Sequence, residues 1–156
     1  MQKPYQPYLT KEQAQQKARH YCAYQERCHS EVKEKLYNLG LHKNEIEELI
    51  SYLIEEDYLN EERFAKTFAG GRFRIKEWGR VKIKYELKQK QVSEYCIKKA
   101  LKEIDPKEYL KTLQKLADQK LSTLKTEKNI FIKRKKLQAF LLQKGFENEI
   151  IKEVMI

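Results

Sequence analysis

Hydrophobic residues recur along this chain with one spacing in three places. In each place, five apolar residues stand at relative positions 0, 4, 9, 14 and 18. They are Val32, Leu36, Leu41, Ile46 and Ile50, then Ile83, Leu87, Val92, Ile97 and Leu101, and finally Leu137, Leu141, Phe146, Ile151 and Met155. Steps of four fit one face of a helix, and the steps of five between them fit a tight turn joining two helices. Each place therefore predicts a helix–turn–helix unit, and the unit repeats after 51 and then 54 residues.

A longer stretch with helical periodicity precedes each unit, at about 11–27, 61–76 and 107–125. The chain is thus expected to contain three tandem three-helix modules, at residues 1–59, 60–104 and 105–156. A module of this size buries little apolar surface alone, so neighbouring modules must pack end to end. The predicted fold class is all-α, with the modules forming an elongated, curved rod of helical repeats.

Residues that start and stop helices fit this division. Thr10 with Gln13 has the form of a capping box, and Asp105 stands before Pro106 at a first helical position. Ser30, Asn60 and Ser93 are further predicted N-caps, while Gly40 and Gly145 stand where helices should end.

The segment "RFAKTFAGGRFRIKEW" (residues 63–78) allows three interpretations. Its alternating end would suit a β-strand, and its two glycines would suit a phosphate-binding loop. A phosphate loop needs a preceding apolar strand and a Lys-Ser/Thr ending, and the segment has neither. A helix explains more, because it aligns five residues into one apolar stripe: Phe64, Phe68, Gly71, Ile75 and Trp78.

On that helix, Gly71 would lie within the stripe and let a neighbouring helix approach closely. Phe73 would project from the opposite side, flanked by Arg72 and Arg74. An outward aromatic ring among cations could stack on bases or anchor a protein partner. Alternatively, another module covers the ring of Phe73, and the sequence leaves both possibilities open.

The following helix has two apolar faces, one with Ile83 and Leu87 and the other with Val81 and Tyr85. Two such faces predict either two packing neighbours within the chain or one neighbour and one external partner.

Charged residues make up 36% of the chain, and the net charge of +10 is unevenly distributed. Residues 1–60 have 8 basic and 10 acidic side chains (net −2), residues 61–104 have 13 and 6 (net +7), and residues 105–156 have 12 and 7 (net +5). Such regional basicity suits contact with a polyanion or an acidic protein surface, although solvated helix faces rich in lysine would look the same. The candidate contact residues are Arg72, Phe73, Arg74, Lys76, Arg80, Lys82, Lys84, Lys88, Lys133, Arg134, Lys135 and Lys136.

Several other classes of protein are disfavoured. No apolar run approaches the length of a membrane span, and the N-terminus has no apolar signal-peptide core, so a cytoplasmic protein is expected. Cys22 and His29 would lie two helical turns apart, too far to share a zinc ion. We see no catalytic pair or nucleophile with its base, and expect a monomer without enzymatic activity, cofactor or metal.

Two adjoining segments resemble the core signature of the RecX regulatory proteins. They are "DYLNEERFAKTF" (residues 57–68) and "WGRVKIKYELKQKQV" (residues 78–92). The order and spacing of many residues carry this resemblance, and the three-module division extends it over nearly the whole chain. Gln91 departs from the pattern, because the family usually has glycine there, and Glu61 stands where aspartate is commoner. The conformation of the turn at Gln91 is therefore open.

The resemblance implies a triple three-helix architecture and a non-enzymatic protein that modulates RecA, the recombinase that polymerises on single-stranded DNA. Family members are understood to lodge in the groove of the RecA filament and to limit its growth, strand exchange and co-protease activity during DNA repair and the SOS response. Direct contact with single- or double-stranded DNA is a further expectation. The main alternative is an autonomous nucleic-acid-binding module, in which the turn at Leu39, Gly40 and Leu41 belongs to a helix-turn-helix.

Overall fold

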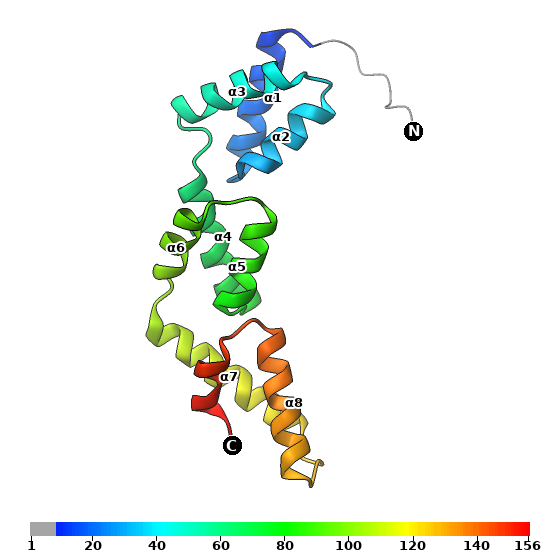
Figure 1. The fold of residues 1–156 in the computed structure, drawn as a ribbon, viewed down its shortest axis with the longest axis vertical. Coiled ribbons are helices and arrows are strands. Elements are labelled where there is room, and N and C mark those ends of the chain that lie inside the picture. Colours follow the sequence, from blue (N-terminus) through cyan, green and yellow to red (C-terminus); the bar gives the residue numbers. More distant parts are fainter. Residues whose placement is uncertain (1–8) are drawn as a thin grey trace, which may run out of the picture.

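The structure is a computed structural model that describes residues 9–156, and within these residues every regular element is helical. The elements are α1 (Lys11–Tyr24), α2 (His29–Asn38), α3 (Lys43–Glu55), α4 (Glu61–Lys76), α5 (Arg80–Gln89), α6 (Glu94–Lys102), α7 (Pro106–Thr123), α8 (Ile130–Gln143), α9 (Asn148–Ile151) and a closing 3-10 turn, Lys152–Val154. Three-helix groups follow one another along an elongated, gently curved rod (Figure 1). The predicted all-α repeat fold is confirmed.

We place the module boundaries at 59/60 and 104/105, in the connections between α3 and α4 and between α6 and α7, and this division remains a proposal. No helix within the described residues is both long and apolar enough to cross a lipid bilayer.

Most predicted helix starts are correct. The Thr10 side chain accepts from the Gln13 N–H, and Asn60, Ser93 and Asp105 cap α4, α6 and α7 in the same manner. The prediction for Ser30 is wrong, because α2 begins after Cys28 and Ser30 lies in its first turn.

The turn after the second helix of each module has one conformation throughout. Gly40, Gln91 and Gly145 have φ values of 89°, 62° and 97°, all in the left-handed region. In each turn the next residue donates its N–H to a carbonyl five residues earlier: Leu41 to Leu36 (3.2 Å), Val92 to Leu87 (3.1 Å) and Phe146 to Leu141 (3.2 Å). Gln91 therefore has the same turn conformation as Gly40 and Gly145, although the left-handed region costs a non-glycine residue about 1 kcal/mol.

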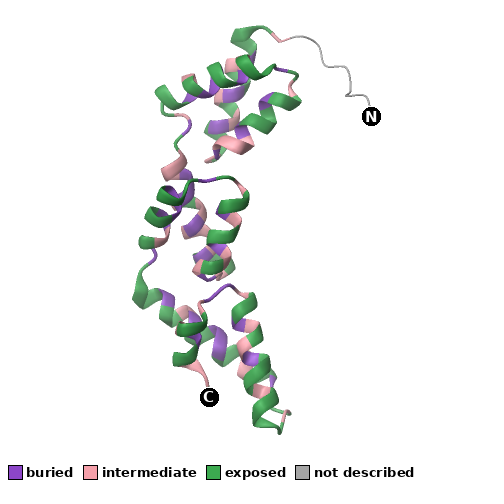
Figure 2. Ribbon diagram, viewed as in Figure 1, coloured by how far each residue is buried: buried purple, intermediate pink, exposed green. Residues whose placement is uncertain are grey.

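The repeated apolar residues form the core, as the spacing predicts. All are buried except Leu101 and Met155, which are partly exposed and pack against the core. Buried side chains form two clusters, and buried positions run along each three-helix group (Figure 2). One cluster belongs to the first module, whereas the other spans the second and third modules and includes Cys28.

The buried face of α4 differs from the predicted stripe. Phe64, Ala65, Ala69 and Phe73 are buried, whereas Ile75 is 80% exposed. A Cβ on Gly71 would meet nothing within 4 Å, so the expected close helix approach there is wrong. The physical reason is that α6 makes the most extensive helix contact with α4, and the fully buried alanines supply the small residues on the core side.

Candidate partner-binding surface

The candidate surface lies around the short connection between α4 and α5. Glu77 ends α4 with a φ of 57°, and the N–H of Trp78 then donates to the carbonyl of Arg72 at 3.2 Å. Trp78 therefore leaves the helix and lies half-buried beside it, rather than in the stripe that the sequence predicted. This turn brings the tryptophan ring next to cations from both flanking helices.

Trp78 and Phe68 alternate with three cations. The Lys82 ammonium lies 4.4 Å from the Trp78 ring centroid, and the Arg72 guanidinium lies 5.5 Å from it. Arg72 also lies 4.6 Å from the Phe68 ring, and Lys90 lies 5.8 Å from that ring on the side of the first module. We call these five residues the cation–aromatic ladder. Cation–π contacts at exposed sites contribute about 0.5–1 kcal/mol each, enough to hold the charged groups at the surface.

A groove of about 240 Å³ adjoins the ladder and is lined in part by Phe68, Arg72 and Lys90. Glu26 and Glu31 line its other side, but both carboxylates are engaged. Glu26 pairs with Arg63 at 2.5 Å, and Glu31 pairs with Lys90 at 3.8 Å. Lys90 is thus shared with the first module, while Arg72 and Lys82 have no carboxylate within 4 Å among the described residues.

The other predicted basic residues of the second module divide into two groups. Lys76 and Lys84 are exposed and have no ion pair within the described part of the chain. Lys88 pairs with Glu94 at 3.2 Å, and the guanidinium of Arg74 folds back over Gly70. The unpaired cations therefore gather along the end of α4 and the outer face of α5.

In the third module, Lys136 pairs with Glu127 at 3.6 Å, and the Arg134 Nε donates to the Ile156 carbonyl at 2.6 Å. Lys133 and Lys135 have no ion pair among residues 9–156. In the view of Figure 1, α2, α5 and α8 follow one another along the same edge of the rod. The basic residues of α5 and α8 thus share that edge but belong to different modules.

Phe73 is not part of this surface. Its side chain is only 7% exposed, and its ring centroid lies 5.7 Å from that of Tyr109 on α7. The expectation of an outward ring is wrong, and the alternative, that a neighbouring module covers it, holds. The ring belongs to the core shared by the second and third modules.

Arg80 is likewise engaged within the chain. Its guanidinium lies 3.9 Å from the Tyr109 ring centroid, and its Nη1 pairs with Glu147 Oε2 at 2.9 Å. The buried Tyr109 hydroxyl accepts the Arg80 backbone N–H at 3.0 Å and donates to Glu147 Oε1. Burial and the hydrogen bond to Glu147 raise the pKa of Tyr109 above its ordinary value. Arg80 thus lies in a polar cluster that joins two modules.

The second apolar face of α5 is exposed. Ile83 and Leu87 are fully buried, whereas Val81 and Tyr85 are more than half exposed and lie beside Lys84 and Lys88 on the outer face. The sequence allowed α5 to have either two packing neighbours within the chain or one neighbour and one external partner. The first of these arrangements is therefore wrong. This face is open to a partner.

Comparisons with known proteins give the family. The family models described as the second and third three-helix domains of RecX match residues 60–101 and 107–155. The Regulatory protein RecX of Clostridium botulinum (strain Eklund 17B) is 35% identical over 126 residues, covering 80% of this chain and 58% of that relative. That of Chlorobium limicola is 33% identical over 131 residues, covering 83% and 80%.

Solved structures agree with the sequence comparison. A crystal structure of RecX from Lactobacillus salivarius superposes with a TM-score of 0.83 and 27% identity, covering 92% of this chain and 93% of that one. The present chain spans little more than half the length of the clostridial relatives. The repeat, the two matched modules and the relatives together show that the chain belongs to the RecX family of regulatory proteins.

Proposed function

We propose that this chain is a non-enzymatic regulator of RecA, which binds the filament that RecA forms on single-stranded DNA. In this proposal it lies in the filament groove and limits filament extension, strand exchange and co-protease activity in DNA repair and the SOS response. Membership of the RecX family is the observation that carries the proposal.

The shape of the molecule supports this function. An elongated rod of three helical modules can lie along a groove and touch several filament subunits at once (Figure 1). Contacts made by linked modules add through a high effective concentration, so individually weak contacts can give tight binding. Such a rod needs no deep pocket or catalytic centre to act.

The unpaired cations support a negatively charged target. Arg72, Lys76, Lys82 and Lys84 lie on one module and have no carboxylate partner among the described residues. Acidic protein side chains and DNA phosphates would both be attracted to this surface. We therefore assign the principal contact to the cation–aromatic ladder and the outer face of α5, with Lys133 and Lys135 as a second contact.

The test measures the ATPase activity and filament length of RecA on single-stranded DNA with and without the protein. We expect shorter filaments and less ATP hydrolysis with the unaltered protein. The double variant Arg72→Ala/Lys82→Ala should need at least about tenfold more protein for the same effect. The double variant Lys98→Ala/Lys102→Ala, which removes equal charge from exposed positions on α6, is the matched control. No effect of the unaltered protein on RecA contradicts the function, and equal loss in both variants contradicts the assigned site.

Direct binding of single-stranded DNA is a second candidate function, and the half-buried ring of Trp78 beside two cations favours it. Aromatic rings among cations bind bases by stacking and phosphates by charge. Trp78 is the only tryptophan, so its fluorescence reports on this site alone. Quenching by an oligonucleotide, with affinity that falls steeply as salt rises, would support direct binding. Unchanged fluorescence at saturating oligonucleotide would contradict stacking on Trp78.

A further inference from the structure

Both joints between modules use the same pair of elements. The start of the second helix of one module lies against the left-handed turn of the next module. At the first joint, the Ser30 hydroxyl of α2 donates to the carbonyl of Lys90, the residue before Gln91. At the second joint, the Gly79 N–H donates to the carbonyl of Lys144 at 2.8 Å, and the Val81 N–H donates to that of Gly145 at 2.9 Å.

This arrangement leaves one element of each kind without a neighbour among residues 9–156. Within this range, no module precedes the left-handed turn at Gly40, and no module follows the start of α8. The two ends of the rod therefore present the two halves of a joint that occurs twice inside it.

The start of α8 carries an exposed apolar group. The repeated apolar residue that begins each unit is the fourth residue of α2 and of α5, but the eighth residue of α8, so α8 has one additional turn. In that turn Ile130, Phe131 and Ile132 are 43%, 75% and 42% exposed. We call these three residues the apolar tip. The next four residues are all basic, and the tip lies at the far end of the rod (Figure 1).

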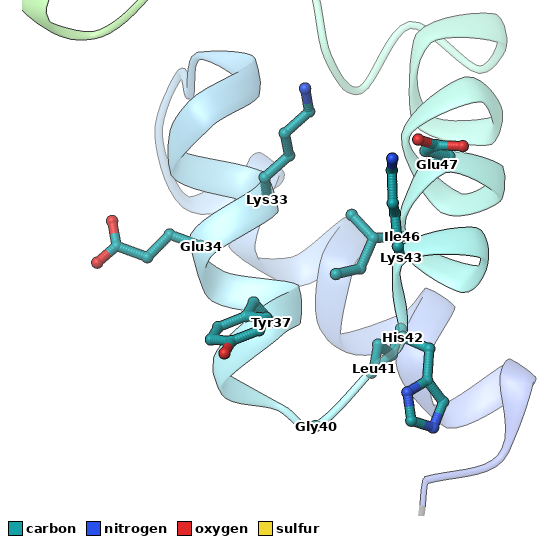
Figure 3. A pocket seen from close by; sticks show the side chains of 9 residues that line it. All are labelled: Lys33, Glu34, Tyr37, Gly40, Leu41, His42, Lys43, Ile46 and Glu47. Carbon is teal, nitrogen blue, oxygen red and sulfur yellow. The ribbon is translucent and has the colours of Figure 1, made fainter. Parts of the chain in front are cut away.

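The opposite end carries an apolar groove beside the Gly40 turn. It has a volume of about 650 Å³ and lies between α2 and α3 (Figure 3). Leu41 and Ile46 line its interior, Glu34 and Glu47 lie on its rim, and Lys33 and Lys43 also border it. We call it the Gly40 groove.

We propose that the apolar tip of one copy of this chain docks in the Gly40 groove of a second copy. The tip supplies three exposed apolar side chains, and the groove supplies apolar walls next to a turn of the kind used at both internal joints. Lys133 and Lys135 behind the tip have no ion pair among residues 9–156, so they can approach Glu34 and Glu47 on the groove rim, where Lys33 and Lys43 also lie. The association does not depend on RecA.

A contact between unlike ends joins copies head to tail and can continue into an open chain. The tip is small, so the contact buries less than the roughly 1,200 Å² of a stable specific interface. We therefore expect a dissociation constant of about 100 μM, which leaves a monomer in dilute solution. Binding along a common filament would raise the local concentration and promote the contact.

The first experiment is sedimentation equilibrium of the full chain from low micromolar concentration to about 1 mM. We expect the weight-average mass to rise with concentration. Phe131→Ser and the charge reversal Glu34→Lys/Glu47→Lys should each weaken association at least about tenfold. Ile75→Ser, which alters an equally exposed apolar residue away from both ends, should leave it unchanged. Circular dichroism confirms that each variant is folded.

Mixing the two defective variants tests the head-to-tail geometry. The tip variant keeps an intact groove, and the groove variant keeps an intact tip. A mixture should therefore form dimers that grow no further, although neither variant associates alone. A protein that stays monomeric to about 1 mM overturns the proposal. So does association that survives either variant, or a mixture that remains monomeric.

Discussion

The two joints of this molecule use equivalent elements but different chemistry. At the first joint, side chains make the contacts, including Arg63 to Glu26 at 2.5 Å and Ser30 to Lys90 at 2.7 Å. At the second joint, backbone hydrogen bonds cross between modules, and the rings of Phe73, Tyr109 and Phe146 form a buried row with centroids 5.7 and 5.0 Å apart. The second joint unites two modules in one core, to which the first module contributes only Cys28.

The difference explains which residues occupy equivalent positions. Position 145 requires glycine for two reasons. Its φ is 97°, and a Cβ there would lie 2.2 Å from the Cβ of Lys82. Its equivalent Gln91 has the same handedness but an exposed side chain, so the first joint leaves room for it. The glycine at position 145 therefore reflects how closely the preceding module approaches, in addition to the turn that it forms.

The largest expected change in stability comes from adding one methyl group at the second joint, where the two backbones touch. In Gly79→Ala, the new Cβ would lie 2.3 Å from the carbonyl carbon of Gly145, so two backbones must separate. We expect the free energy of unfolding to fall by about 3 kcal/mol, as measured by urea denaturation.

Gly71→Ala is the matched control for that variant. A Cβ there meets nothing within 4 Å, and alanine favours helix, so stability should rise by about 0.5–1 kcal/mol. Equal behaviour of the two variants would show that the modules do not touch at Gly79.

The second-largest loss of stability is expected when one buried hydroxyl is removed. Tyr109→Phe removes the donor to Glu147 and the acceptor for the Arg80 N–H, and should lower the free energy of unfolding by about 1–2 kcal/mol. Because folding raises the pKa of Tyr109 above its ordinary value of 10.0, its contribution is complete below pH 10 and is lost as the pH rises further. Denaturation curves between neutral pH and pH 11 should therefore converge for the two proteins. A constant difference would contradict this role.

A change at the first joint should act in the opposite direction. Gln91→Gly relieves the strain of a left-handed non-glycine residue and should raise the free energy of unfolding by up to about 1 kcal/mol. The melting temperature measures the gain. A decrease would mean that the Gln91 side chain contributes packing that outweighs its backbone strain.

The smallest effect is expected from the partly exposed ion pairs of the first joint. Arg63→Gln loses its contacts with Glu26 and Asp57 and should cost about 1 kcal/mol or less. The cost should diminish at 1 M salt, whereas that of Tyr109→Phe should not, because Tyr109 is buried. Equal salt sensitivity at both sites would remove the distinction between a polar joint and a buried one.

The sequence predicted the repeat well because its signals are local. Each unit depends on apolar residues within one helix–turn–helix, and the capping residues Thr10, Asn60 and Ser93 act within three positions of themselves. Gln91 could be identified as equivalent to Gly40 and Gly145 from spacing alone. The conformation of that turn still required the structure.

Contacts between modules could not be predicted in the same way. Phe73 is covered by Tyr109, and Arg80 pairs with Glu147, which lies 67 positions further along the chain. No periodicity within α4 or α5 specifies such partners, so Phe73 and Arg80 looked like surface residues. A tyrosine in the apolar stripe of α7 was the one available signal, because a buried hydroxyl needs a partner. It could not say which residue that partner is.

The touching backbones of Gly79 and Gly145 have a mechanical consequence. With no side chains between them to rearrange, the second and third modules should move as one rigid body, and any bending of the rod should occur at the first joint, where side chains make the contacts. The rod would then fit a curved target by rotating the first module relative to the other two.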